Sequence, residues 1–385
     1  MDLVIWNKFC TNYDIDELLG LSKEIKEYIF NLILKQKSTF RGLVIVLLNY
    51  LNPVSIQYKI VSGFMSLHYL TGYGKKIYLF GEFHFSGLKC KQQGIKVSDF
   101  IVKNIELNPR FIDLFLEIPL IHKTSKDIKV YTSSVEDELN NITYLLQKCL
   151  RLDKKICNYP NLRVHYTDVR NIIHYESELP FINKLNIAML KYFYALVNKN
   201  EDDKLSSQHI FYSLKKFQPK EVKEYKKLKT PDDFKDYFYK NLFTTKLKKQ
   251  LDNIEDTAIR TTIKTWFLEA INRNKTNLIS WDKLVRNFSE TDSEKMAKIL
   301  VPFIHMLVPY MDLYLSARMF RKFSEIKYYN SKEAINIIVY AGNDHINNYV
   351  DLLTNYLNFK HEYNYKSDGN FCMDLSQLKS KLLFE

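Results

Sequence analysis

Four short runs with strong β-strand character constrain the fold of this chain more than any other feature. They are rich in β-branched and aromatic residues and occupy residues 77–80 (IYLF), 111–116 (FIDLFL), 162–167 (LRVHYT) and 335–341 (INIIVYA). Stretches with helical periodicity separate the first three runs. Strands that alternate with helices are typical of β-α-β units. The sequence therefore predicts an α/β fold with a mainly parallel central sheet flanked by helices.

The remaining segments divide the chain around this core. Residues 1–70 carry apolar residues at helical spacing, as in DELLGLSKEIKEYIF, which predicts an N-terminal helical segment. We expect residues 71–175 to form the first part of the α/β core and residues 176–325 to form a long helical insertion. Residues 326–385 then supply the last strand or strands and the helix that complete the core.

Charge and codon bias limit the class of partner. The chain has 385 residues and a formal net charge of +12, which permits contact with nucleic acid or another anionic surface. Lysine, asparagine, isoleucine and tyrosine, all with A/T-rich codons, are abundant, which points to an A/T-rich viral or parasitic genome. A solvated basic surface is therefore the simpler explanation of the charge.

Cysteine usage and hydropathy bear on the compartment. The five cysteines are scattered without a C-x-x-C pair, which favours reduced thiols and a cytoplasm-like reducing compartment, either host cytoplasm or a virion if the protein is viral. The N-terminus lacks a signal-peptide pattern, and the most apolar segments are shorter than the roughly 18 residues that cross a bilayer. We therefore expect a soluble protein without a transmembrane segment.

Polar residues follow each strand-like run at its carboxyl end. They are Gly81, Glu82, His84 and Ser86 after the first run, Glu117 after the second, Asp168 and Arg170 after the third, and Gly342, Asn343, Asp344 and His345 after the last. Ligands of open parallel sheets bind outside the carboxyl ends of the strands. Four strands that deliver polar side chains to that edge would build one pocket.

The segment GEFHFS has an alternation of its own. In an extended chain Glu82, His84 and Ser86 share one face, whereas Phe83 and Phe85 point to the other. The aromatic pair can anchor the segment in the core while the polar residues face a cavity.

Each polar residue taken alone also has a structural explanation. Glu117 could cap a helix or pair with a lysine, and Asp168 and Arg170 could form an ion pair. Asp344 suits the first turn of a helix whatever the function. The prediction of a site therefore depends on the joint placement of these residues.

A histidine flanked by carboxylates can act as a general base whose tautomer and proton affinity its neighbours set. Glu82 or Glu117 could orient His84 in this way. His345 could supply a second acid or base, or stabilise an oxyanion. Arg170 could hold an anionic group of the substrate.

A divalent metal is the alternative use of the same residues. Glu82, His84 and His345 are candidate ligands for Mn, Co or Zn, which would activate water. The spacing lacks the H-E-x-x-H pattern of a specific metal motif. Ser86 or Cys90 could instead act as a nucleophile, although a structural role suits Cys90 better.

The motifs resemble those of a known clan. GEFHFS is similar to the G-E-x-H-x-S or G-E-x-x-H opening of the clan that includes erythromycin esterases, TIKI and TraB/PrgY proteins and ChaN-like haem-binding proteins. DLFLE and GNDH match the glutamate that ends the second strand and the late G-x-x-H element of those chains. YTDVR and DLYLSARMF also resemble segments of uncharacterised proteins of large DNA viruses. The resemblance covers residues 75–175 and 310–355.

This resemblance implies an α/β core with a catalytic or metal site at the strand ends. Carried over by motif, the catalytic set is Glu82, His84, Glu117 and His345. We predict a hydrolase, esterase-like or metallopeptidase-like, that acts on a small molecule or a peptide. The activities of the clan diverge, so the shared fold does not fix the substrate. The residues expected to bind the substrate are Ser86, Asp168, Arg170 and Arg318.

Arg318 belongs to a group of polar residues, with Asp312 and Tyr314, that interrupts an apolar helix predicted around residues 310–320. Tyr314 and Arg318 lie four residues apart and share one helix face. These side chains could reach the pocket, or they could satisfy one another in the core.

A second hypothesis is a catalytically inactive viral or virion-associated protein that binds nucleic acid. Aromatic side chains stand among the lysines of residues 215–249, and stacking with lysine contacts is how proteins hold single strands. These aromatic residues are Phe217, Tyr225, Phe234, Tyr237 and Tyr239. An amphipathic helical pair with a solvated lysine face is the structural alternative. Binding of haem or another small ligand without turnover is a third hypothesis.

Overall fold

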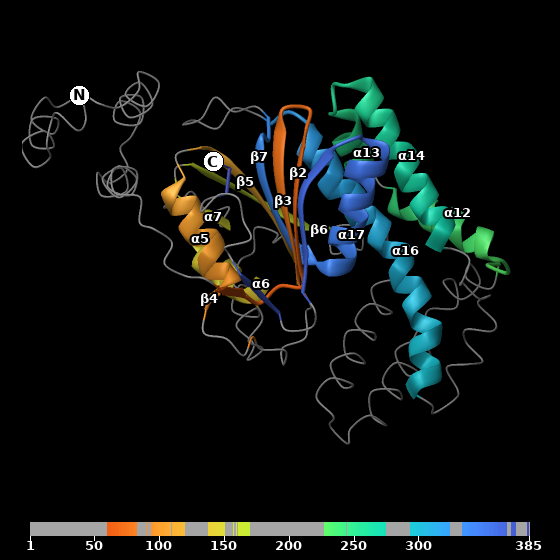
Figure 1. The fold of residues 1–385 in the computed structure, drawn as a ribbon. Coiled ribbons are helices and arrows are strands. Elements are labelled where there is room, and N and C mark those ends of the chain that lie inside the picture. The colour runs from red at the N-terminus through yellow and green to blue at the C-terminus, as the bar shows by residue number, and fades with distance from the viewer. Residues whose placement is uncertain are drawn as a thin grey trace, which may run out of the picture.

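A six-stranded sheet with helices on both faces forms the centre of the molecule (Figure 1). The strands lie in the order β6-β5-β7-β3-β2-β8. Their bounds are β2 Ser66–Gly72, β3 Lys75–Glu82, β5 Ile112–Pro119, β6 Leu162–Asp168, β7 Asn336–Gly342 and β8 Lys360–Lys366. The computed structural model describes residues 60–82, 90, 94–108, 110–119, 138–150, 157, 159, 161–169, 227–243, 245–274, 293–323, 333–367, 371–374 and 383–384.

The sheet is mixed, so the expectation of a mainly parallel sheet is wrong. β6, β5, β7 and β3 pair in parallel, whereas β2 runs antiparallel to both β3 and β8. A two-residue hairpin explains the change of direction. Tyr73 and Gly74 have φ of 49° and 70°, and positive φ at both central residues is what a type I′ hairpin turn requires.

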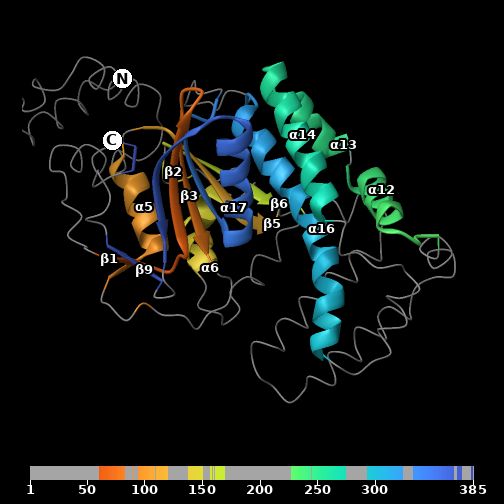
Figure 2. The ribbon, with the colours of Figure 1, turned by 45° about the vertical axis from the view of Figure 1, so that its right-hand side comes forward.

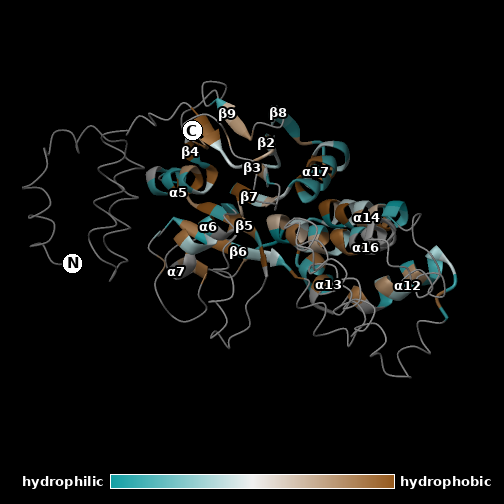
Figure 3. Cartoon of the chain, turned by 90° about the horizontal axis from the view of Figure 1, so that it is seen from below, coloured by the Kyte–Doolittle hydropathy of each residue, from teal (hydrophilic) through white to brown (hydrophobic). Residues whose placement is uncertain are grey.

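Two helical layers cover the sheet (Figure 1). On one face lie α5 (Val97–Leu107), α6 (Glu138–Leu145) and α7 (Gln147–Leu150). On the other lie α14 (Thr257–Asn274), α16 (Ser293–Phe320) and α17 (Asn343–Asp351). Successive side chains of a strand point to opposite faces and so contribute to the hydrophobic cores on both sides of the sheet. Leu79 packs on the α16 face and Phe80 on the α5 face. In Figure 3, the central strands and parts of α14 and α16 carry the brown colour of hydrophobic residues.

Strands also occupy the last residues of the segment expected to be helical. β1 (Ile60–Ser62) and β2 lie there, and β1 joins β4 (Ile95–Lys96) and β9 (Cys372–Asp374) in a small sheet. The helical expectation is therefore wrong for these residues. The rest of the expected helical segment, residues 1–59, lies outside the described residues.

Helices make up the described part of the expected insertion (Figure 2). α12 (Pro231–Leu242) begins at a capping box between Thr230 and Asp233, and α13 (Thr245–Asp252) follows it. α16 packs against α13, α14 and α17 and also touches β6. The insertion therefore contributes α16 to the same core as the sheet.

The C-terminal part returns to the sheet. β7 leads directly into α17, which continues as the π-helical turn η3 (Leu352–Tyr356) before β8 forms the edge of the sheet. None of the helices in the described part of the chain combines the length and apolar character that a membrane span requires.

Two disulfides join cysteines that were expected to be reduced. Cys90 pairs with Cys372, and Cys149 pairs with Cys157. The expectation of reduced thiols is therefore wrong for these four residues. The first pair is separated by 282 positions, so sequence spacing carries no sign of it.

Candidate functional site

The carboxyl ends of four strands lie along one edge of the sheet. The register pairs Glu82 with Gly342 and Leu116 with Tyr340, so the ends of β3, β5 and β7 are level. Asp168, the last residue of β6, pairs with Pro119 of β5. Because α17 starts immediately after β7, this edge also receives the first turn of that helix.

His345, in the first turn of α17, lies between two carboxylates. Its Nδ1 is 2.6 Å from Oδ1 of Asp312 on α16, and its Nε2 is 3.4 Å from Oε1 of Glu117 on β5. All three side chains are buried, with Asp312 wholly enclosed. The backbone N–H of Gly342 donates to Oε2 of Glu117 over 2.7 Å, which leaves Oε1 directed towards the imidazole.

The two carboxylates control the charge of His345. Burial alone would lower the pKa of this imidazole, but the charges of Glu117 and Asp312, and their hydrogen bonds, raise it to about 10. His345 is therefore an imidazolium at neutral pH and donates from both ring nitrogens. An imidazolium in this position can donate a proton or stabilise negative charge, but it cannot act as a base until it has lost that proton.

Further donors hold Asp312 in place. Nδ2 of Asn348 donates to its Oδ2 over 2.7 Å, and Tyr349 also forms a hydrogen bond with it. Burial, followed by the charge of Asp312, raises the pKa of the Tyr349 phenol well above its usual value, so Tyr349 remains a donor. Asp312 is therefore a fixed anchor for His345. The sequence showed it as a polar residue in an apolar helix, without a partner.

Glu82 lies on the other face of the sheet from Glu117. The Tyr340 hydroxyl donates to Oε2 of Glu82 over 2.5 Å, and Tyr340 belongs to the core on the α5 face. Glu117 instead contacts His345 of α17, which also contacts Asp312 of α16. The structure therefore brings Glu117 and His345 together and directs the Glu82 side chain elsewhere. His84, Ser86 and Arg170 lie outside the described residues.

The glycine of the GEFHFS segment allows a close approach to α17. Ser66 donates its hydroxyl to Oδ1 of Asn343 over 2.6 Å. A Cβ on Gly81 would lie 2.5 Å from both of these oxygens, well inside van der Waals contact. Only glycine fits here without displacing Asn343, which begins the helix that carries His345.

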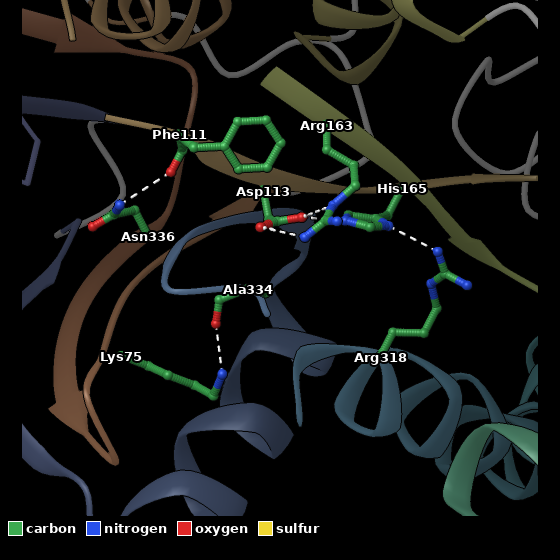
Figure 4. A network of polar contacts seen from close by, with 8 residues as sticks. All are labelled: Lys75, Phe111, Asp113, Arg163, His165, Arg318, Ala334 and Asn336. Atoms are coloured by element: carbon green, nitrogen blue, oxygen red, sulfur yellow. Dashed lines mark hydrogen bonds and ion pairs between the residues drawn. The ribbon is translucent and has the colours of Figure 1, made fainter. Parts of the chain in front are cut away.

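A second polar network runs along β5 and β6 on the α16 face and was not predicted (Figure 4). Nε and Nη2 of Arg163 donate to the two oxygens of the buried Asp113 over 2.5 and 3.0 Å. His165 lies 2.7 Å from Asp113 through Nε2 and 2.8 Å from Nη2 of Arg318 through Nδ1. Arg318, expected to bind substrate, therefore contacts His165 instead of the Glu117–His345 pair.

Burial determines the charge state of His165. Desolvation lowers the pKa of this imidazole to about 4, because it outweighs the hydrogen bond and charge of Asp113 and is reinforced by the charges of Arg318 and Arg163. His165 is therefore neutral at physiological pH. Charged residues inside the apolar runs FIDLFL and LRVHYT were the sequence signal for this network.

The described metal candidates do not form a metal site. Both ring nitrogens of His345 face carboxylates, at 2.6 Å from Asp312 and 3.4 Å from Glu117. Glu82 lies on the opposite face of the sheet. Among the described residues there is no group of three or more His, Cys, Asp or Glu side chains arranged to hold a metal ion.

The aromatic residues of the lysine-rich segment face the core where the structure describes them. Phe234 is fully buried, and Tyr237 and Tyr239 pack against the same core. Phe217 and Tyr225 lie outside the described residues. Phe234 is therefore not available to stack on a nucleotide base.

Comparison with known proteins does not assign the chain to a family. No family model matches it, and no solved structure matches it. One similarity is to the CRISPR-associated endoribonuclease Cas13a of Leptotrichia shahii, at 27% identity over 189 residues. The similarity covers 44% of this chain and only 13% of the length of that protein.

Proposed function

We propose that the protein is a hydrolase whose active site lies at the carboxyl edge of β5 and β7, with Glu117 and His345 as its acid–base pair. The observation that carries the proposal is the position of His345, which lies 2.6 Å from Asp312 and faces Glu117 across 3.4 Å. The resemblance of GEFHFS, DLFLE and GNDH to the erythromycin esterase–TIKI clan supports the same reaction class. Glu82 and His84, which that resemblance also implies, remain predictions.

The pair can move the two protons that hydrolysis of an ester or amide requires. Oε1 of Glu117 accepts a proton from the attacking water as its oxygen bonds to the carbonyl carbon. Nε2–H of His345 donates a proton to the leaving oxygen or nitrogen as the old bond breaks. Because Oε1 and Nε2 are neighbours, Glu117 then returns its proton to His345, and the site is restored.

Kinetic measurements on a matched set of variants test this proposal. Activity would be screened on ester, peptide and phosphoester substrates, with and without added Mn, Co or Zn. We expect Glu117→Gln and His345→Gln each to lower kcat by about 100-fold or more, the range typical of a lost acid or base. Glu255→Gln, an exposed carboxylate on the insertion, is the control and should leave kcat unchanged. The absence of turnover on all three classes, or full activity of a folded Glu117→Gln variant, would refute the proposal.

A further inference from the structure

Three guanidinium groups surround the ring of Phe323 at the C-terminal end of α16. The Cζ atoms of Arg163, Arg321 and Arg318 lie 4.1, 4.6 and 5.3 Å from the ring centroid. Arginine stacks favourably on aromatic rings, but three like charges on one ring repel one another. Negative charge near such a cluster would offset this repulsion.

Only part of that charge is present among the described residues. Asp113 uses both oxygens on Arg163, so this pair is neutral as a whole. His165 is neutral as well, because a guanidinium can only donate and Nδ1 must therefore accept from Arg318. The other ring nitrogen then donates to Asp113. Within the described residues, Arg318 and Arg321 remain as two positive charges without a carboxylate partner.

The partners that the described residues offer these two arginines are neutral. Arg318 donates to His165 and to the Tyr314 hydroxyl, and Arg321 donates to Oε1 of Gln250 over 2.6 Å. Neither arginine forms an ion pair with a carboxylate in the described part of the chain. Nε of each is buried and has no hydrogen-bond partner there. Each side chain is partly exposed as a whole, so solvent can reach the pair.

We propose that Arg318 and Arg321 form a binding site for the phosphate group of a small-molecule ligand. Two guanidinium charges match a phosphate group, which carries a charge of about −1.5 to −2 near neutral pH. Guanidinium groups also bind phosphate oxygens through pairs of parallel hydrogen bonds, and both side chains are partly exposed.

This site is distinct from the proposed catalytic pair. Arg318 lies about 9 Å farther along the α16 axis than Asp312, at 1.5 Å per residue. Arg318 contacts His165, which pairs in register with Phe115, whereas His345 contacts Glu117 at the end of β5. Burial, followed by the charge of Arg318, lowers the pKa of the Arg321 guanidinium to about 10, and a bound phosphate would raise this pKa again.

Titration of the full chain with inorganic phosphate tests the proposal. Binding would be followed by calorimetry and by ³¹P NMR, with sodium chloride and sodium acetate at matched ionic strength as comparison ligands. We expect saturable binding of phosphate, weaker binding of acetate and no saturable effect of chloride. Arg321→Gln and Arg318→Gln should each weaken phosphate binding by about tenfold or more, since each removes a charge-assisted donor. Arg321→Lys keeps the charge but loses the paired donors of the guanidinium, so its phosphate affinity should lie between those of wild type and Arg321→Gln.

Arg273→Gln is the matched control, because it removes the same charge from an exposed position on α14. It should bind phosphate like the wild type, and circular dichroism would confirm that every variant is folded. Wild-type protein that shows no saturable phosphate binding would overturn the proposal. Equal weakening by Arg273→Gln would also overturn it, and acetate binding as tight as phosphate would overturn the assignment of phosphate. These wild-type comparisons remain decisive even if an arginine variant fails to fold.

Discussion

Gly342 donates its backbone N–H to Oε2 of Glu117 over 2.7 Å, although the two residues are 225 positions apart in the chain. Gly342 is also the N-cap of α17, so Glu117 lies where the helix dipole favours negative charge. This one hydrogen bond fixes the carboxylate and joins the ends of β5 and β7. It also leaves Oε1 of Glu117 directed towards His345. Substitutions around this contact make the clearest predictions.

Asp312→Asn should destabilise the protein. The substitution removes one of the two charges that compensate a buried imidazolium, and loss of one partner from a buried pair typically costs about 3–5 kcal/mol. We expect the unfolding free energy in a urea titration to fall by about 3 kcal/mol or more. Asp232→Asn, at an exposed carboxylate on α12, should change it by less than about 0.5 kcal/mol. Equal stability of the two variants would contradict the assigned role of Asp312.

The stability of the protein should decline in alkaline solution through His345. Its pKa is about 10 in the folded state and 6.5 in the reference state, so the folded protein holds this proton more tightly. The contribution to stability is therefore fully present below pH 6.5 and is lost as the pH rises towards 10. Urea titrations across this window should show a steeper decline for wild type than for His345→Gln. Parallel curves for the two proteins would show that His345 is not held as an imidazolium.

Gly81→Ala should disturb the start of α17. The added Cβ would lie 2.5 Å from oxygens of Ser66 and Asn343, so Asn343 must move. Overpacking of this kind costs about 1–3 kcal/mol, and the shift should also lower any hydrolytic kcat. Gly74→Asn is the control, because nothing lies within 4 Å of a Cβ there and asparagine tolerates its φ of 70°. If Gly81→Ala is as stable and active as this control, the close approach is not required.

Cys372→Ser tests the long-range disulfide. Cys372 lies on β9 and pairs with Cys90, which closes a very long loop. Disulfides stabilise proteins by about 2–4 kcal/mol, mainly by restricting the unfolded chain, so the variant should lose stability of that order. Peptide mapping of the unreduced protein should recover the linked peptides. Free thiols at both positions in the purified protein would contradict the pairing.

Local sequence patterns predicted the strands that carry the site better than they predicted the sheet. IYLF and INIIVYA correspond to β3 and β7 because buried parallel strands are continuous apolar runs. β2 was not predicted, because most of its residues were assigned to the helical segment that ends at residue 70. The Tyr73–Gly74 turn after it is nevertheless a hairpin signal. β7 lies between β5 and β3 although it is far from both in the sequence. The local spacing of apolar residues carries no information about such a pairing.

The composition of the site was predictable only in part for the same reason. Glu117 and His345 could be placed at strand ends from the sequence. The opposite orientation of Glu82 could not, because it depends on the register of β3 with β7, which brings Glu82 within reach of the Tyr340 hydroxyl, and on the position of α16. Asp312 could be identified as a polar residue in an apolar helix, but its partner is set by how α16 crosses the sheet.

The decline of the unfolding free energy at acidic pH should depend on His165. Its pKa is about 4 in the folded state, below the reference value of 6.5, so between these values the unfolded chain binds the proton and the folded protein does not. The contribution of His165 is therefore present above pH 6.5 and is lost as the pH falls towards 4. The slope can reach about 1.4 kcal/mol per pH unit, the value for uptake of one proton.

A neutral replacement separates this effect from other acid-sensitive groups. His68 also has a pKa of about 4, lowered mainly by burial, so part of the wild-type slope should persist in His165→Gln. The difference between wild type and His165→Gln, measured by urea titration from pH 6.5 to 4, isolates the contribution of His165. His305→Gln, at an exposed position on α16, should retain the wild-type slope. If His165→Gln also retains it, the imidazole must already be protonated in the folded state, and the donor from Arg318 would have no acceptor.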